Sequence, residues 1–325
     1  MKVAWFDTKD WEKEFLDKKT DDMDIEFFEQ SLGPETVEKT QGFDAVAVFV
    51  ESNVDKQVIE ESNFDYVACR STGFDHVDLD AAEKNNVSVF NVPQYGGTTV
   101  AEHTFGLILS LSRKIYSAVR KVEEGSFDHE GLKGFDLKGK TLGVVGTGTI
   151  GQNVIRIANG FDMDVIASDP YPKKEVANEL GFMYVSREDL LEKADIVSIH
   201  CPLTDETKHL LSDQEFSLME ETILINTSRG EIIDTEALIK ALESDRVRAA
   251  GLDVLEEECY FEDDLEYIGQ LDEKCDPEVI LEDHILLDRE DVIVTPHNAF
   301  NSQEALERIE ETTIKNLREK ENTVV

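Results

Sequence analysis

Three side chains suited to anion binding and acid–base chemistry each follow a strand-like apolar run: Arg229, Glu258 and His297. A guanidinium can clamp a carboxylate through two parallel hydrogen bonds. A histidine, which titrates near ~6.5 when unperturbed, can give a proton to a ketone oxygen. A nearby glutamate can stabilise the resulting imidazolium and orient its ring. These residue types suit the reduction of a 2-keto acid, provided that a hydride donor binds beside them.

A glycine-rich stretch at residues 140–170 is the candidate site for that donor. It contains in order a strand, a glycine turn, a helix, a second strand and an acid. The strands are expected at Leu142–Val145 and Val165–Ala167, the helix at Gln152–Ala158, and the glycines are Gly146, Gly148 and Gly151. This context, rather than the glycines alone, favours a dinucleotide-binding motif.

Each residue of this motif has a physical role in holding a dinucleotide. Gly146 permits the tight turn after the strand, Gly148 leaves room for the pyrophosphate, and Gly151 lets the helix pack closely. The free N–H groups at the helix start can bind phosphate oxygens. Asp169, 18 residues after Gly151, can accept the ribose hydroxyls of NAD and would repel a 2′-phosphate. We therefore expect NAD rather than NADP as the cofactor.

The elements around these residues alternate between strands and helices. In residues 1–97 we expect strands at Val3–Phe6, Ala45–Val50, Tyr66–Cys69 and Val87–Asn91, and helices at Lys9–Lys19, Val54–Ser62 and Leu79–Asn85. This alternation predicts a parallel sheet. Two turns, 70–73 and 93–97, fall at the carboxyl ends of strands, where open α/β sheets bind ligands.

A second βα run continues after the glycine motif and predicts a doubly wound sheet. Its further strands are expected at Ile196–His200, Thr222–Asn226, Ala249–Asp253 and Val292–Thr295, and its helices at Asp213–Leu218 and Thr235–Glu243. Arg229, Glu258 and His297 would then lie on consecutive connections of one sheet. The tail, Ser302–Glu319, is expected to be a helix that returns to the first domain.

Between the two runs, residues 98–124 have the pattern of one long helix. Apolar residues surround it near Phe105–Leu111, which predicts burial between domains or at a subunit interface. For His103, within this helix, we favour a buried structural role over a catalytic one. Residues 125–139 are expected to form a loop.

The composition limits the possible partners and compartments. The net charge of −39 argues against nucleic acids and anionic membrane surfaces, which are bound through clustered Lys and Arg. No apolar run approaches the ~18 residues of a membrane span. The chain starts directly with a strand-like run, so we expect a cytoplasmic protein without a signal peptide. Four scattered cysteines lack metal-ligand or disulfide spacing, so we expect free thiols and no metal site.

The 71 acidic residues, against 32 basic ones, are spread over the chain rather than gathered in a patch. Such a surface repels itself at low ionic strength, and salt screens the repulsion. We interpret the acidity as halophilic adaptation, and the alternative is a charge that only aids solubility. Lysine is not scarce, so the composition typical of extreme salt adaptation is incomplete.

Several segments together resemble the D-specific 2-hydroxyacid dehydrogenase family, and within it the lactate-type members. The resemblance covers nearly the whole chain and rests on RSTGFDHVDLDAA (70–82), VPQYGGTTVAEHTFGLIL (92–109), GVVGTGTIG (143–151), HCPLTDETKHL (200–210), INTSRG (225–230), GLDVLEEE (251–258) and TPHNAF (295–300). It implies an α/β protein with two Rossmann-like or flavodoxin-like parallel-sheet domains and the active site in the cleft between them. Residues 1–97 and 300–325 would form the substrate domain and residues 98–299 the NAD-binding Rossmann domain. Family members are usually dimers built on the long helix, so we expect a homodimer.

The resemblance also implies roles for individual residues. Arg229, Glu258 and His297 match the substrate-binding arginine, the glutamate and the acid/base histidine. Around the substrate it implies backbone contacts from Thr72 and Gly73, and pocket walls from Tyr95 and Phe49. Around NAD it implies Thr149 and Ile150 at the pyrophosphate, His200, Cys201 and Pro202 beside the adenosine and ribose, and Thr227 and Asp253 near the nicotinamide, with Asp253 taking the carboxamide.

Two departures from the family pattern affect the choice of substrate. Cys259 follows Glu258, where many members have proline. The connection from Glu258 to His297 spans 39 positions and is strongly acidic. Lactate-type members have a longer connection here than phosphoglycerate-type ones, so its length favours lactate. We expect no regulatory domain after residue 325, which would count against the longer phosphoglycerate dehydrogenases.

The expected reaction is therefore the NADH-dependent reduction of pyruvate to D-lactate. The nearest alternative is another substrate, such as glyoxylate, hydroxypyruvate or a branched 2-keto acid. A different class is an NAD-sensing binding protein, like the corepressors that share this fold. The complete Arg–Glu–His set and the lack of extra partner segments favour an enzyme.

Overall fold

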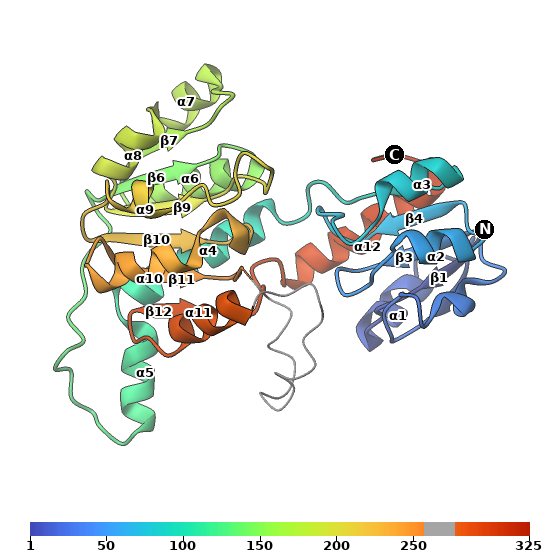
Figure 1. Ribbon diagram of the computed structural model, residues 1–325, viewed down its shortest axis with the longest axis horizontal. Helices are drawn as coiled ribbons and strands as arrows, with labels where there is room; N and C mark the ends of the chain where they lie inside the picture. Colours follow the sequence, from blue (N-terminus) through green and yellow to red (C-terminus); the bar gives the residue numbers. More distant parts are fainter. Residues whose placement is uncertain (257–276) are drawn as a thin grey trace. The chain divides into compact units, whose positions relative to one another are not determined.

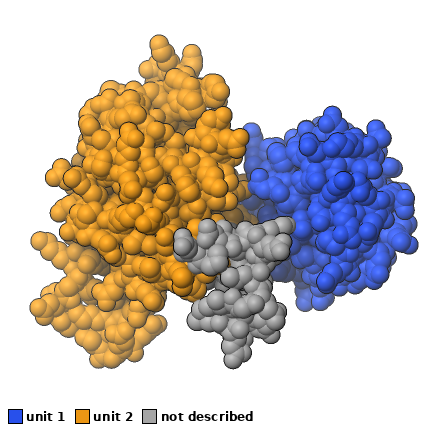
Figure 2. Space-filling model, viewed as in Figure 1, with its two compact units in different colours: residues 1–95, 301–325 blue, residues 96–300 orange. Residues whose placement is uncertain are grey.

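The computed structural model describes residues 1–256 and 277–325, which divide into two compact units (Figure 1, Figure 2). Unit 1 comprises Met1–Tyr95 and Asn301–Val325, and unit 2 comprises Gly96–Phe300. Each unit is an α/β structure built on a parallel sheet, which confirms the predicted fold class.

The described sheet of unit 1 has five parallel strands in the order β2-β1-β3-β4-β5, the flavodoxin-like order. They are β1 (Lys2–Trp5), β2 (Asp24–Phe27), β3 (Ala45–Val48), β4 (Tyr66–Cys69) and β5 (Ser88–Phe90). Alternate strand residues point to opposite faces and form two separate apolar cores. Helices α1 (Asp10–Asp17) and α12 (Gln303–Glu319) pack on one face, and α2 (Lys56–Glu61) and α3 (Leu79–Asn85) on the other.

The described sheet of unit 2 has seven parallel strands in the order β12-β11-β10-β9-β6-β7-β8. They are β6 (Thr141–Val145), β7 (Asp164–Ser168), β8 (Met183–Tyr184), β9 (Ile196–Ile199), β10 (Thr222–Asn226), β11 (Val247–Leu252) and β12 (Val292–Val294). From β8 to β11 this is the doubly wound order of dinucleotide-binding folds, with β12 added at the edge.

Helices cover both faces of this sheet, because each strand is apolar on both sides. One face carries α4 (Gly97–Ser112) and α6 (Thr149–Gly160). The other carries α8 (Arg187–Lys193), α9 (Asp213–Phe216), α10 (Thr235–Glu243) and α11 (Pro277–Leu287). A further helix, α7 (Lys174–Leu180), connects β7 to β8.

The prediction of one helix over 98–124 is wrong, because α4 ends at Ser112 and α5 (Ile115–Glu123) is separate. Lys114 between them has a φ of 50°, which an α-helix cannot accommodate. Close to this break, the loop after α5 contacts the end of α4. There, the N–H of Phe135 donates to the Ser112 carbonyl, at 2.9 Å.

Several short elements escaped the sequence prediction for physical reasons. Strand β2 lies at the sheet edge, and its residues alternate between exposed and half-buried, so it lacks the apolar run of a central strand. Strand β8 has two residues, and α7 buries only Leu180. Among the described helices, none is both long and apolar enough to cross a membrane.

Candidate active site

The strand order of unit 2 reverses between β6 and β9, and the glycine turn lies at that point. Gly146 follows β6 with a φ of 92°, and a Cβ there would lie 2.8 Å from the backbone nitrogen of Cys201. A Cβ on Gly151 would lie 2.1 Å from the Gly146 carbonyl oxygen, so α6 packs directly on the turn. A Cβ on Gly148 would have no described atom within 4 Å apart from the neighbouring residues, which leaves the start of α6 open to a ligand.

The first residues of α6, Thr149 and Ile150, present backbone N–H groups that have no partner within the helix. Thr149 is exposed and Ile150 is half-buried. Because the helix dipole adds positive potential at this end, the turn can hold the phosphates of a dinucleotide.

Asp169 follows β7, and hydrogen bonds from two other residues fix the position of its carboxylate. Oδ2 accepts hydrogen bonds from the N–H and the hydroxyl of Thr147, both at 2.7 Å, and Oδ1 accepts from the N–H of Tyr171 at 2.8 Å. Burial alone would raise the pKa of Asp169, but these hydrogen bonds hold it below its ordinary value. The side chain is therefore an ordered anion beside the glycine turn, suited to ribose hydroxyls and unsuited to a phosphate.

The segment His200–Pro202 follows β9, across the switch point from the glycine turn. Burial lowers the pKa of His200 to about 3, and its Nε2 lies 2.7 Å from the Ser198 hydroxyl. Burial also raises the pKa of the Cys201 thiol to about 11. Both side chains are therefore neutral near pH 7, so they can line a binding site but cannot exchange protons there.

Backbone hydrogen bonds join the connections that carry Arg229 and His297. The N–H of Asp253 donates to the Asn226 carbonyl, and the N–H of His297 donates to the Asp253 carbonyl, both at 2.8 Å. The Asn226 side chain donates to the carbonyl of Arg229 at 2.9 Å. The carboxyl ends of β10, β11 and β12 therefore lie together at one end of the sheet.

The Asp253 carboxylate organises the loop after β12. It is 1% exposed and accepts hydrogen bonds from the Thr295 hydroxyl and from the N–H groups of Asn298 and Ala299, at 2.9 and 2.8 Å. Burial alone would raise the pKa of Asp253, but its hydrogen bonds, including one from His103, hold it below its ordinary value. An ionised carboxylate thus shapes the loop on both sides of His297.

His297 lies in that loop with a φ of 45°, a left-handed conformation that is rare for residues other than glycine. Its N–H donates to the carbonyls of both Asp253 and Thr295, which holds the backbone in this form. The imidazole is half-buried and contacts the ring of Phe300 edge-on, with centroids 6.5 Å apart. Strained residues of this kind gather at active sites.

Arg229 is half-buried, and its Nη1 donates to the Ser228 carbonyl at 2.7 Å. Thr227 is buried, with its hydroxyl 3.2 Å from that of Thr104 on α4. Glu258 lies outside the described residues, so its predicted place beside His297 stays a prediction.

In unit 1, the 71–73 turn follows β4 and is held by its own polar atoms. The Thr72 hydroxyl donates to the Val92 carbonyl at 2.8 Å, and the Asn91 side chain donates to the Thr72 carbonyl at 2.7 Å. The Ser71 hydroxyl donates to the Gly73 carbonyl at 2.6 Å. Among these bonds, the N–H groups of Thr72 and Gly73 are not used, so they can serve an anion.

The other two residues predicted to line the substrate pocket also lie in unit 1. The N–H of Phe49, just after β3, donates to the Asp7 carboxylate at 2.9 Å. The carbonyl of Tyr95 accepts a hydrogen bond from Nε of Arg308 at 2.9 Å. Both side chains are half-buried.

Arg70, directly before this turn, is 1% exposed and bridges two helices of unit 1. Its Nη1 donates to Glu12 of α1 at 2.6 Å and to Glu310 of α12 at 3.0 Å. Its Nη2 donates to the Phe6 carbonyl at 2.7 Å. Burial, together with the nearby Glu12 and against the pull of Arg70, raises the pKa of Glu310 to about 7.

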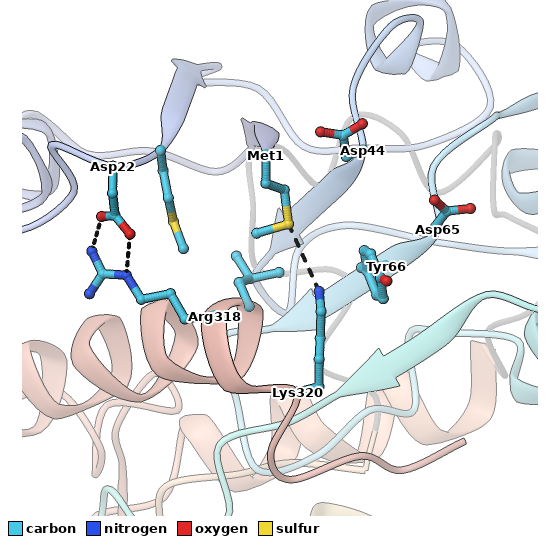
Figure 3. A pocket seen from close by; sticks show the side chains of 9 residues that line it. Met1, Asp22, Asp44, Asp65, Tyr66, Arg318 and Lys320 are labelled. Carbon is cyan, nitrogen blue, oxygen red and sulfur yellow. Dashed lines mark hydrogen bonds and ion pairs between the residues drawn. The ribbon is translucent and has the colours of Figure 1, made fainter.

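A hollow of about 420 Å³ lies elsewhere in unit 1 (Figure 3). It is lined partly by Met1, Asp44 and Asp65, which precede β1, β3 and β4, so it opens at the end of the sheet away from the 71–73 turn. Arg318 pairs with Asp22 in it, as Figure 3 shows. Nε of Arg318 donates to Oδ2 of Asp22 at 2.9 Å. None of the predicted site residues lines this hollow.

Three residues with clear places in this geometry were missed from the sequence: Thr147, Asn226 and Thr295. Thr147 and Thr295 donate to carboxylates distant in the chain, those of Asp169 and Asp253, which local patterns do not reveal. The Asn226 side chain bonds within its own turn, to the Arg229 carbonyl. The expectation that His103 is buried is wrong, because its side chain is 22% exposed and contacts Asp253 rather than an apolar core, and its structural role stays a prediction. Among the described residues, no group of three or more His, Cys, Asp or Glu could hold a metal ion.

Comparison with known proteins decides the family. Residues 105–299 match the family model described as D-isomer specific 2-hydroxyacid dehydrogenase, NAD binding domain. The D-lactate dehydrogenase of Escherichia coli K12 is 39% identical over 327 residues, which cover 98% of this chain and 96% of that protein. The chain belongs to the D-specific 2-hydroxyacid dehydrogenase family.

Solved structures of family members agree in fold over the whole chain. The apo structure of the Escherichia coli D-lactate dehydrogenase is 36% identical, with a TM-score of 0.86 and full coverage of both chains. The Aquifex aeolicus D-lactate dehydrogenase, solved with NAD and lactic acid, is 30% identical, with a TM-score of 0.85 and 99% coverage of both. This D-2-hydroxyacid dehydrogenase is therefore an NAD-dependent enzyme, which confirms the cofactor predicted from Asp169.

Proposed function

We propose that this dehydrogenase reduces pyruvate to D-lactate with NADH, and catalyses the reverse reaction. The observation that carries the proposal is the meeting of the Arg229 and His297 connections through Asn226 and Asp253 at one edge of the NAD-binding sheet. The name of the Escherichia coli relative, and the long connection between Glu258 and His297, support lactate as the product.

In the proposed reaction, Arg229 clamps the substrate carboxylate through paired hydrogen bonds. His297 gives a proton to the ketone oxygen as C2 accepts the hydride, and Glu258 stabilises the imidazolium. Bound NADH supplies the hydride. The backbone of Thr72 and Gly73 also binds the carboxylate, while Tyr95 and Phe49 limit the size of the substrate side chain.

For the cofactor, we assign the pyrophosphate to the turn of Gly146, Gly148 and Gly151 and to the backbone of Thr149 and Ile150. Asp169 accepts the ribose hydroxyls, and His200, Cys201 and Pro202 flank the adenosine. Thr227 and Asp253 lie near the nicotinamide, and Asp253 accepts from its carboxamide. The Oδ2 atom has one described donor, the N–H of Ala299, and so keeps capacity for this bond.

Steady-state rates with a panel of 2-keto acids test the substrate. We expect the highest kcat/KM with pyruvate. A preference for glyoxylate, hydroxypyruvate or a branched keto acid would reassign the substrate within the family. Tight NAD binding without turnover of any keto acid would instead favour the NAD-sensing binding protein.

For the assembly, we propose a homodimer that uses α5. Ile115, Tyr116, Val119 and Val122 are each about half exposed, and no residue of this helix is buried. A second copy of the chain would cover such an amphipathic face. Sedimentation should therefore give a dimer, and V119E should shift it toward monomer.

We also propose a cytoplasmic enzyme adapted to high salt. At ~0.01 M salt, charges interact over about 30 Å, whereas at ~1 M they interact over about 3 Å. Salt should therefore relieve most of the repulsion from a net charge of −39. The melting temperature should rise from tens of millimolar to molar KCl, and a flat or falling curve would leave solubility as the reason for the charge.

A further inference from the structure

Two residues that have no role in the proposed reaction, His209 and Glu256, contact each other in unit 2. Nε2 of His209 is hydrogen-bonded to Oε1 of Glu256, and Nδ1 lies 3.8 Å from the Asp234 carboxylate. The His209 backbone has a φ of 49° and is held by its N–H, which donates to the Glu231 carbonyl at 2.8 Å. The left-handed backbone and the contacts of the ring together hold the His209 side chain in one position.

The other carboxylate oxygen of Glu256 contacts the start of α10. Oε2 accepts from the hydroxyl of Thr235 at 2.9 Å and from its N–H at 3.3 Å. Thr235 is the first residue of α10, where the N–H lacks a partner inside the helix and the dipole favours an anion. The Glu256 side chain is 11% exposed, so both its oxygens are committed within the fold.

The peptide between Leu255 and Glu256 packs against Gly230. A Cβ atom on Gly230 would lie 1.9 Å from the Leu255 carbonyl oxygen and 2.4 Å from the Glu256 nitrogen. Gly230 directly follows Arg229, and this contact joins backbone to backbone. No flexible side chain lies between the two segments, so a shift of the peptide must move the Arg229 loop.

We propose that Glu256 is a positioning residue for Arg229. Its two oxygens anchor the Leu255–Glu256 peptide to the His209 loop and to α10, and Gly230 is seated against that peptide. This inference rests on the proposed function, because it concerns the arginine assigned there to the substrate carboxylate. Glu256 itself touches neither substrate nor cofactor in this scheme.

The test compares three variants of the full-length enzyme by steady-state kinetics with pyruvate and by fluorescence titration with NADH. E256A removes both anchors, E256Q keeps an acceptor for Thr235, and E236A is the control. Glu236 is an exposed glutamate on α10, and its carboxylate lies 2.9 Å from Nζ of Lys240. E256A should lower kcat/KM about tenfold to a hundredfold, with raised KM, because small misplacements of a clamp are costly. NADH affinity should stay within about twofold, E256Q should recover much of the loss, and E236A should match wild type.

A merely structural role predicts a different result, in which E256A lowers the melting temperature while KM for pyruvate stays normal in the folded enzyme. That result would overturn the inference, as would a loss of NADH affinity as large as the rise in KM for pyruvate. If E256A does not fold, H209A removes one anchor and must give the same split between KM and NADH affinity. Wild-type enzyme that reduces no keto acid would overturn the proposed function as well, whereas an active wild type with unaffected variants would overturn only this inference.

Discussion

Nε2 of His103, on α4, lies 3.3 Å from Oδ1 of Asp253, at the end of β11. The same nitrogen is 3.1 Å from the Thr295 hydroxyl, which itself donates to Asp253. A helix and two strand ends therefore converge on one buried carboxylate. Because that carboxylate also binds the N–H groups after His297, it determines where the proposed acid/base histidine lies.

Replacing Asp253 with asparagine tests this relationship. The asparagine amide has only one acceptor oxygen, and its NH2 group would face donors that now bind the carboxylate. At least one buried N–H or hydroxyl would therefore lose its partner. D253N should lower the free energy of unfolding by about 1–3 kcal/mol and reduce kcat more than about tenfold. Urea denaturation and steady-state kinetics measure both effects, and D164N, at an exposed residue, is the control. Wild-type kinetics in D253N would separate this carboxylate from the position of His297.

The carboxylate clamp is tested by R229K. Lysine keeps the charge but cannot form two parallel hydrogen bonds, so KM for pyruvate should rise and kcat should fall strongly. Initial-rate kinetics measure both constants, and the exposed Arg156, changed to lysine, serves as the control. A near-normal KM in R229K would remove Arg229 from the substrate site.

Cofactor selectivity is tested by D169R. In the proposed cofactor site, Asp169 places an ordered negative charge where the 2′-phosphate of NADP would lie, so wild-type enzyme should strongly prefer NADH. Arginine there should shift preference toward NADPH, measured as the ratio of kcat/KM for the two cofactors. Because Asp169 also binds Thr147, overall activity should fall too. Equal efficiency of wild-type enzyme with both cofactors would contradict the assignment.

The burial of Glu310 beside Arg70 predicts that the free energy of unfolding depends on pH. Glu310 ionises at about pH 7 in the folded chain against an ordinary value of 4.5, so the folded state binds the proton more tightly. Its contribution is complete below about pH 4.5 and is lost as the pH rises through about 7. E310Q imitates the protonated form, so above neutral pH it should be more stable than wild type, by about 1–3 kcal/mol.

Urea denaturation of wild type and E310Q from acid to alkaline pH measures this difference. The advantage of E310Q should grow with pH and then level off above neutrality. E311Q is the control, since Glu311 is exposed and pairs with Lys19 at the surface. Parallel curves for wild type and E310Q would show that the pKa of Glu310 is the same in the folded and unfolded chain, which would contradict this prediction.

The sequence predicted the central elements well, because their apolar runs and turn residues are local signals. The run Leu142–Val145 before Gly146 identified β6 and its turn, although the predicted helix began at Gln152 and α6 begins at Thr149. The break at Lys114 has no such local signal, since no glycine or proline marks it, and it lies beside a bond from Phe135 to Ser112 that forms only in the folded chain. Edge strand β2 lacks an apolar run and gave no signal.

The proposed site likewise has a part that was predictable from the sequence and a part that was not. Arg229 and His297 follow strands, so their meeting at one sheet edge was predictable from the βα alternation. The polar residues that hold them, Asn226 and Asp253, act through buried hydrogen bonds whose geometry exists only in the folded chain. Likewise, the contact of Gly230 with Leu255 follows from the packing of two loops and has no sequence signature.

The most direct test of the proposed function is the reaction of purified enzyme with NADH and pyruvate, with chiral analysis of the lactate formed. We expect oxidation of NADH in a one-to-one ratio with lactate, and D-lactate as the product. Formation of L-lactate, or no oxidation of NADH with pyruvate across the range of KCl concentrations, would contradict the proposed function.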